Sequence, residues 1–369
     1  MRDEGEDQDL DSTHHSSSQI TSSRGEFDFI KRLRQRALRR RVAINDAHPS
    51  SLHLGIGDDA AVIRQYAGRD TIITTDLLVE EIDFRRDAMP PRLLGHKALA
   101  VSLSDVAAMG ARPRWALLSI GVPRDVWDSP FLDQFYEGFF TLAGRYDVTL
   151  IGGDVSRTPE RVVIDSIVVG ETARGHAILR AGARPGDHIF VTGTLGGAAA
   201  GLRLILGGAR LTKGSGRQRD TRTIEQLLLR QLRPEPRVGW GMILGKERLA
   251  TALIDLSDGL SSDLAHLCDE SGTGALIEAS RIPIDPLLVE VCEQEGLDPY
   301  SLALHGGEDF ELLFTVRPRN LARLPKRIGG VPVTYIGDVT DRSKRLRILE
   351  RGRARALRPA GFSHFDRES

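Results

Sequence analysis

Apolar and polar residues are arranged along the chain in segments that predict both strands and helices. Short apolar runs of strand length occur at Thr71–Thr75, Trp115–Val122 and Arg161–Val169. Longer segments with helical spacing occur at Arg92–Met109 and Val126–Tyr146. Because the two kinds of segment alternate, we expect a mixed α/β or α+β fold.

A second set of elements begins near Gly186. Its predicted members are the strands His188–Thr192, Thr251–Asp255 and Glu311–Val316 and the helices Ala198–Leu206 and Leu260–Glu270. The two sets are separated by Ala173–Pro185, a stretch rich in Gly, Ala and Arg. We therefore predict two domains, 25–175 and 176–369, and we read Gly207–Thr223 as an exposed loop inserted in the second one.

Both ends of the chain carry a charge bias. Residues 1–24 combine six acids with two arginines and are almost devoid of apolar side chains, which predicts a disordered tail. Residues 341–369 hold nine basic and four acidic side chains, a net charge of +5. Such a run favours a solvated edge, and it could also assist a phosphorylated ligand.

Composition excludes several classes of protein. The 369 residues carry 50 basic and 51 acidic side chains, so no overall field draws the chain to nucleic acid. No apolar stretch is long enough for a membrane span, and the N-terminus lacks the apolar core of a signal peptide. The two cysteines, Cys268 and Cys292, lack the spacing of a zinc site and indicate reduced thiols. We expect a cytoplasmic protein that binds neither membrane nor nucleic acid.

The informative chemistry is a set of carboxylates that follow glycines or end apolar strands. These points are Gly55–Asp59, Thr74–Asp76, Ile151–Asp154, Ile254–Gly259 and Gly306–Asp309. Glycine lets the backbone approach a ligand closely, and an acid at a strand end points into the crevice where α/β proteins bind ligands. Each point alone is typical of a turn or a helix cap, but five together indicate a site.

Asp105 adds a separate argument from helical spacing. The apolar stripe of the predicted helix Arg92–Met109 runs through Leu94, Ala98 and Val101, and Asp105 continues it. A carboxylate on a packing face must meet a cation or be protonated. It is either a structural, ion-paired residue or part of the site.

Many acids without a His/Cys cluster indicate a hard divalent cation with oxygen ligands, of which Mg²⁺ commonly carries substrate phosphates. Phosphoryl transfer is therefore the leading chemistry. The chain has no GxxxxGK[ST] or HRDxxxxN motif, which argues against P-loop enzymes and protein kinases. Gly193–Gly197 lies between a predicted strand and helix, where it forms either an anion-binding turn or a plain turn.

Read in order, the motifs resemble the thiamine-monophosphate kinase family, in the superfamily of aminoimidazole ribonucleotide synthetase. The resemblance runs from about residue 25 to 365. The motifs that carry it are GEF at 25–27, GIGDDAAV at 55–62, TTDLLVE at 74–80, HKALAVSLSDVAAMGA at 96–111, LIGGD at 150–154, LRAGARPGD at 179–187, IDLSDGLSSDL at 254–264, HGGEDFELLFTV at 305–316 and GFSHF at 361–365.

The resemblance implies a homodimer in which N-terminal sheets pair into a barrel beside C-terminal α/β domains. It also implies direct transfer of the γ-phosphate of ATP to thiamine phosphate, with several Mg²⁺ ions between the two ligands. The implied metal ligands are Asp59, Thr74, Thr75 (through its side chain or its carbonyl), Asp76, Asp105, Asp154, Asp255 and Asp258. The implied ATP contacts are Gly153, Asp154, Arg180 and Ser257, and the implied catalytic residues are Asp258, Asp154 and Arg180.

Glu308 and Phe362 match positions that hold the thiamine moiety in the family. In the adjacent acid pairs Asp58–Asp59 and Glu308–Asp309, the resemblance assigns the site role to Asp59 and Glu308 rather than to Asp58 and Asp309. The chain departs from the family pattern at Asp83, where a His is common and where we expect contact with the substrate. Two alternatives stay open at this point. One is a related enzyme that phosphorylates another small acceptor, and the other is a non-catalytic thiamine-phosphate binding protein.

Overall fold

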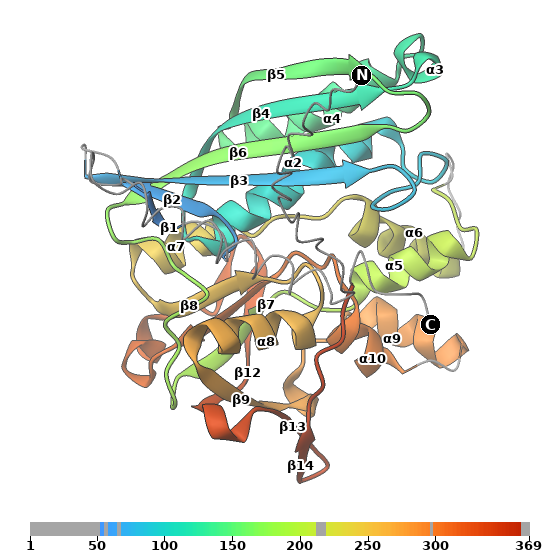
Figure 1. Ribbon diagram of the computed structural model, residues 1–369. Helices are drawn as coiled ribbons and strands as arrows, with labels where there is room; N and C mark the ends of the chain where they lie inside the picture. The colour runs from blue at the N-terminus through green and yellow to red at the C-terminus, as the bar shows by residue number, and fades with distance from the viewer. Residues whose placement is uncertain (1–51, 55–57, 65–67, 212–218, 296–297, 363–369) are drawn as a thin grey trace, which may run out of the picture.

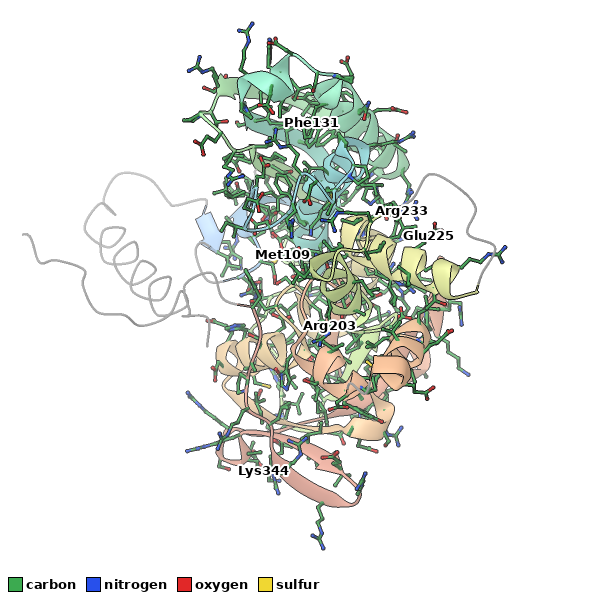
Figure 2. All side chains as sticks on the ribbon, turned by 90° about the vertical axis from the view of Figure 1, so that its right-hand side faces the viewer. Met109, Phe131, Arg203, Glu225, Arg233 and Lys344 are labelled. Atoms are coloured by element: carbon green, nitrogen blue, oxygen red, sulfur yellow. The ribbon has the colours of Figure 1, made fainter. Side chains whose placement is uncertain are left out.

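The computed structural model describes residues 52–54, 58–64, 68–211, 219–295 and 298–362. It contains two sheets, each with its own helices, stacked along the length of the molecule (Figure 1). In the perpendicular view of Figure 2, Phe131 marks one half, Lys344 marks the far end of the other, and Met109 lies where the halves meet. The predicted tail at 1–24, the GEF segment and Gly55–Gly57 lie outside the described residues.

The first half is a mixed sheet with helices on one face. Its strand order is β1-β2-β3-β6-β4-β5, and only the pair β4 and β5 is parallel. The strands are β1 Leu52–Leu54, β2 Ala61–Arg64, β3 Arg69–Val79, β4 Arg112–Val122, β5 Thr149–Arg157 and β6 Val163–Ala173. The helices are α2 Pro91–Ala108, α3 Arg124–Trp127 and α4 Phe131–Tyr146.

The second half is built on the sheet order β14-β13-β9-β12-β7-β10-β8, with β11 paired to β12. Its strands are β7 His188–Thr192, β8 Ala250–Asp255, β9 Thr273–Glu278, β10 Leu312–Val316, β11 Arg327–Ile328, β12 Val331–Asp341, β13 Leu346–Glu350 and β14 Arg353–Ala356. Its helices are α5 Gly197–Leu206, α6 Arg219–Leu232, α7 Val238–Lys246, α8 Leu260–Ser271, α9 Pro286–Glu295 and α10 Pro299–His305. Together the two halves confirm the mixed α/β expectation.

Two predictions of local structure were wrong. The helix predicted over Val126–Tyr146 is divided into α3 and α4, because Pro130 lacks the N–H that a continuous helix would need there. The loop predicted over Gly207–Thr223 ends sooner, since α6 already begins at Arg219. Amphipathic spacing of apolar residues from Thr223 onward supports that helix.

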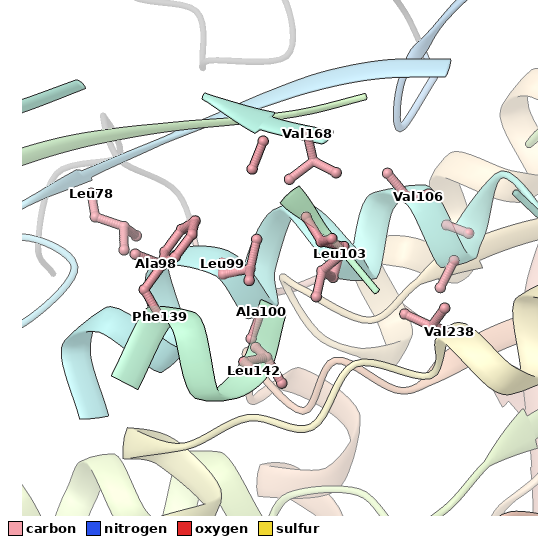
Figure 3. Packing of buried hydrophobic residues seen from close by; sticks show 14 of the residues in the cluster. Leu78, Ala98, Leu99, Ala100, Leu103, Val106, Phe139, Leu142, Val168 and Val238 are labelled. Carbon is pink, nitrogen blue, oxygen red and sulfur yellow. The ribbon is translucent and has the colours of Figure 1, made fainter. Parts of the chain in front are cut away.

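Helix α2 lies at the centre of the molecule and is buried on all sides. Figure 3 shows it between Val168 of the first sheet and Leu142 of α4, with Val238 of α7 at its far end. Close packing on both neighbours depends on glycines: a Cβ on Gly138 would lie 1.8 Å from the carbonyl oxygen of Arg92, and one on Gly241 would lie 2.1 Å from that of Ala107. Helix α2 is thereby held in a fixed position between the two halves.

The opposite face of the first sheet, which we call the open face, has no helix over it in the described part of the chain (Figure 1). A row of paired positions crosses this face from Leu77 through Asp165 and Ser119 to Asp154. Leu77 is 58% exposed, and Trp115, on the same face, is 39% exposed. Apolar side chains on an uncovered sheet face are typical of an interaction surface.

Candidate active site

Five of the predicted site residues lie together where the two halves meet. Asp59 precedes β2, Thr74 and Asp76 lie on β3, Asp105 is on α2, and Asp255 ends β8. One carboxylate oxygen each from Asp59, Asp105 and Asp255 lies within 4.8 Å of the others. The hydroxyl of Thr74 donates a hydrogen bond to Asp105. We call these five residues the acidic cluster.

Two buried serines of α2 orient carboxylates of the acidic cluster. Ser102 donates from Oγ to Asp76 Oδ2 at 2.6 Å, and Ser104 donates from Oγ to Asp255 Oδ2 at 2.6 Å. The second bond joins α2 of the first half to β8 of the second. Both serine side chains are fully buried, so the orientation of each carboxylate is fixed by the packing of α2.

Arg180, from the segment between the two sheets, pairs with the acidic cluster. Its guanidinium donates to both carboxylate oxygens of Asp59, from Nη2 at 2.7 Å and from Nε at 3.1 Å. Its backbone N–H donates to Asp58 Oδ2 at 3.1 Å. This bidentate geometry is the strong form of an Arg–carboxylate pair. Asp58 therefore helps to hold Arg180 in place.

Burial and mutual repulsion raise the pKa of three acids of the cluster, Asp76, Asp105 and Asp255, and of the neighbouring Asp58. Burial raises the pKa of Asp76 to about 6, although the Ser102 hydroxyl opposes the shift. Burial, followed by repulsion from neighbouring carboxylates, raises the pKa of Asp105 and of Asp255 well above the ordinary value. Burial and the charge of Asp59 raise the pKa of Asp58 to about 7. A cation that binds among these groups is favoured because it relieves this repulsion.

The loop after β8 carries the next predicted residues. The backbone N–H groups of Asp258 and Gly259 both donate to Asp263 Oδ2, at 3.2 and 3.0 Å. Asp263 lies in the first turn of α8, and burial raises its pKa well above the ordinary value. The carbonyl of Ser257 accepts a bond from the backbone N–H of Glu308 at 2.8 Å. Ser257 and Asp258 are thus held on a braced turn beside Asp255.

The end of the described chain is fastened to the same loop. Ser261 donates from Oγ to the carbonyl of Ala360 at 2.7 Å and accepts from its N–H at 3.1 Å. The backbone N–H of Phe362 points to the carbonyl of Asp258 at 3.4 Å. The ring of Phe362 is half exposed. The rest of GFSHF lies outside the described residues.

Glu308 meets two polar partners from other elements. Its Oε1 lies 2.6 Å from Lys97 Nζ of α2, and its Oε2 accepts a hydrogen bond from Gln231 of α6. Its side chain stays partly exposed, whereas that of Lys97 is fully buried. A carboxylate of the second half is therefore anchored by the central helix of the first.

Asp154 and Thr75 do not join the acidic cluster within one chain. Asp154 lies on the edge strand β5, three strands from Leu77 on β3, a separation of roughly 14 Å at about 4.8 Å per strand. Thr75 also points to the open face, where its hydroxyl donates to Asp165 Oδ1 at 2.6 Å. Gly153 is required structurally, because a Cβ there would lie 1.9 Å from the carbonyl oxygen of Leu118.

Asp83 and Asp309 accept hydrogen bonds from the backbone. Asp83 Oδ2 accepts from the N–H of Val79 at 2.7 Å and closes the turn after β3. Asp309 accepts from the N–H groups of Gly196 and Ala198, at 2.7 and 3.2 Å, at the start of α5. For the glycine turn before α5 this geometry favours a capped turn over an anion site. Contact between Asp83 and a substrate stays a prediction.

Sequence reasoning missed the residues that hold these groups, among them Ser102, Ser104, Lys97, Gln231 and Asp263. A signal for Lys97 was present, since it lies eight residues before Asp105 inside a segment that is otherwise apolar or small. A lysine in such a helix requires a buried partner. No comparable signal marks Gln231, because its partner is distant in sequence.

The chain matches two family models that together span most of it. Residues 57–172 match "AIR synthase related protein, N-terminal domain", and residues 184–348 match "AIR synthase related protein, C-terminal domain". The chain is therefore an AIR synthase related protein in both of its halves. Among the described helices none is both long and apolar enough to cross a membrane.

Curated relatives narrow this class. The chain is 39% identical to a thiamine-monophosphate kinase of Escherichia coli (strain K12), over 92% of this chain and 98% of the relative. It is 36% identical to that of Bacillus subtilis (strain 168), over 92% and 99%. The chain belongs to the thiamine-monophosphate kinase family.

Solved structures agree with this assignment. One described as "AaThiL complexed with AMPPCP and TMP" has a TM-score of 0.78 and 33% identity, covering 94% of this chain and all of that one. A thiamine-monophosphate kinase from Stenotrophomonas maltophilia K279a has a TM-score of 0.68 and 38% identity, covering 86% of this chain and 94% of that one.

Proposed function

We propose that this protein transfers the γ-phosphate of ATP to thiamine phosphate, giving thiamine diphosphate and ADP in the cytoplasm. The observation that carries the proposal is the acidic cluster with Arg180 bound to Asp59. Family membership and the likeness to a structure solved with AMPPCP and TMP support it. The two cysteines of the chain are buried and are not joined in a disulfide, as expected of a reducing compartment.

The donor set of the cluster suits Mg²⁺. Three carboxylate oxygens converge within 4.8 Å, and neither His nor Cys accompanies them in this group. Asp59, Asp105 and Asp255 would hold the metal, with Thr74 and Asp76 beside them. When bound, Mg²⁺ neutralises phosphate charge and helps to bring the reacting oxygens into line.

The protein side chains would do the positioning. Arg180 carries a fork of N–H donors that fits phosphate oxygens. Burial opposes the charge of its guanidinium, but the neighbouring carboxylates, Asp59 first among them, outweigh burial and raise its pKa, so it stays charged. Ser257 and Asp258 lie on the braced turn next to Asp255, where they would contact the nucleotide. We infer no covalent intermediate, because direct transfer needs orientation and charge stabilisation rather than a protein nucleophile.

Thiamine phosphate would lie between the Ser257–Asp258 loop and the C-terminal segment. The backbone N–H of Glu308 donates to the carbonyl of Ser257, and that of Phe362 points to the carbonyl of Asp258, so both residues are fastened to one loop. A partly exposed carboxylate and an exposed ring suit a cationic heteroaromatic ligand. Asp83 is a third candidate whose substrate contact remains our proposal.

The active form would be a homodimer joined through the open face. Leu77 and Trp115 expose apolar surface there, across strands that already pack helices on their other side. A two-fold pairing of this face would cover it and would close the two sheets toward a barrel. It would also remove Thr75 and Asp154 from bulk solvent.

An ADP-release assay tests the proposal. Purified protein is given ATP and Mg²⁺ with thiamine phosphate, and separately with unphosphorylated thiamine. We expect ADP release that depends on thiamine phosphate and is absent with thiamine. If ADP is released only with another phosphorylated acceptor, that compound and not thiamine phosphate is the substrate. If no acceptor causes ADP release, the protein binds its ligand without catalysis.

A further inference from the structure

The segment around Glu308 is held in an unusual way. Glu308 has a φ of 63°, in the left-handed region that non-glycine residues rarely adopt. Its neighbour Gly307 packs against the loop after β8, where a Cβ would lie 2.4 Å from the carbonyl oxygen of Ser257. The carboxylate of Glu308 then reaches Lys97 on α2 and Gln231 on α6.

Three unfavourable features converge on this one carboxylate. The backbone of Glu308 is strained, and the ammonium group of Lys97 is fully buried. Gln231 is 4% exposed and directs its N–H to Glu308, while its Oε1 has no hydrogen-bond partner among the described residues. An apolar residue in place of Lys97 would avoid the buried charge, and one in place of Gln231 would avoid the unpaired amide oxygen. Strain and buried charge retained around a partly exposed carboxylate are typical of a functional position.

We propose that Lys97 and Gln231 are positioning residues that fix Glu308 for the acceptor substrate. The inference rests on the proposed function, in which Glu308 contacts thiamine phosphate. Lys97 neutralises Glu308 through an ion pair to Oε1, and Gln231 donates a hydrogen bond to Oε2. Each carboxylate oxygen has a second lone pair, so both can still accept a bond from the substrate. Recognition by Glu308 then depends on the direction of its oxygens more than on net charge.

The test is a double-variant cycle on the two KM values. Lys97→Met, Glu308→Gln and the double variant are compared with the wild type for thiamine phosphate and for ATP. We expect Lys97→Met to raise the KM for thiamine phosphate about tenfold and to leave the KM for ATP within twofold, as when binding of one substrate is weakened. In the Glu308→Gln background, Lys97→Met should cause no further rise, because it acts through Glu308.

Two further variants separate this role from folding. Gln231→Leu removes one donor without stranding a charge, and it should raise the KM for thiamine phosphate in the same direction. Arg237→Met breaks another buried pair, with Glu311, and should lower the melting temperature without changing the ratio of the two KM values. If Lys97→Met changes both KM values alike, changes neither, or adds fully to Glu308→Gln, the role of Lys97 is overturned. A wild type that does not phosphorylate thiamine phosphate overturns both this inference and the proposed function.

Discussion

Arg180 and Asp59 form a bidentate ion pair at the meeting point of the two sheets, with N–O distances of 2.7 and 3.1 Å. Asp59 also contributes an oxygen to the group of three carboxylates that suits a metal. The carboxylate of Asp59 therefore binds Arg180, which we propose contacts ATP, and also belongs to the proposed metal site. Metal binding and the position of Arg180 should consequently be coupled.

Arg180→Ala tests this coupling. With the guanidinium removed, both oxygens of Asp59 become available and one repelling charge is lost. We expect the variant to bind Mn²⁺ several-fold more tightly than the wild type without nucleotide, and to show a KM for ATP raised about tenfold. Electron paramagnetic resonance of free Mn²⁺ measures the first quantity. Arg184→Ala, at an exposed position of the same segment, is the control, and unchanged or weaker Mn²⁺ binding by Arg180→Ala would contradict the coupling.

Asp255→Asn should exchange activity for stability. The amide cannot supply a charged ligand, so we expect turnover to fall by about 10²–10³. It also removes a buried carboxylate whose pKa is raised by burial and by Asp59, and it can still accept from Ser104. In the presence of a chelator the variant should therefore melt at a higher temperature than the wild type. Thermal melts beside the surface variant Asp133→Asn check this, and a less stable Asp255→Asn would argue against the repulsion.

Local patterns were enough to predict the elements that build the site. The strand predicted over His188–Thr192 matches β7, and Asp105 does lie among buried residues of α2. The helical stripe was informative because a carboxylate on a packing face has few explanations. Asp59 was indicated because it follows glycines, and Asp76 and Asp255 because they follow apolar strand-like runs. The fold brings these three acids together.

Contacts distant in sequence could not be predicted in the same way. Gln231 meets Glu308 across 77 residues, and Ser104 meets Asp255 across 151. Nothing local distinguishes such a serine or glutamine from a solvated one. The split of the helix at Pro130 was missed because the helical spacing of apolar residues continues on both sides of that proline. The positions of Asp154 and Thr75 on the open face depend on a β-strand register that spacing does not reveal.

Asp309 predicts a pH dependence of stability. Burial raises its pKa to about 7, although two backbone N–H groups oppose the shift. The folded state then binds more protons than the unfolded state between about pH 4 and pH 7, so stability falls as the pH rises through this window. Asp309→Asn keeps an acceptor for Gly196 and removes the titration. In denaturant titrations, the free energy of unfolding of the variant minus that of the wild type should grow by roughly 2–4 kcal/mol from pH 4 to pH 8. A difference that stays constant over this range would refute the prediction.

The open face predicts a dimer. Light scattering should give twice the chain mass of 40.5 kDa at micromolar concentration. Leu77→Asp places a charge on the exposed apolar surface and should give the single-chain mass. Leu206→Asp, at an equally exposed position on α5, should leave the dimer intact. A wild type of about 40.5 kDa across this range would rule out the pairing.

The central claim is the transfer of one phosphoryl group to a phosphate that is already attached to thiamine. Phosphorus NMR of a reaction containing ATP, Mg²⁺ and thiamine phosphate follows both products directly. We expect the two phosphate resonances of thiamine diphosphate to grow in step with those of ADP, and no new phosphorylated product when unphosphorylated thiamine replaces thiamine phosphate. ADP that accumulates with inorganic phosphate, without thiamine diphosphate, would contradict the account.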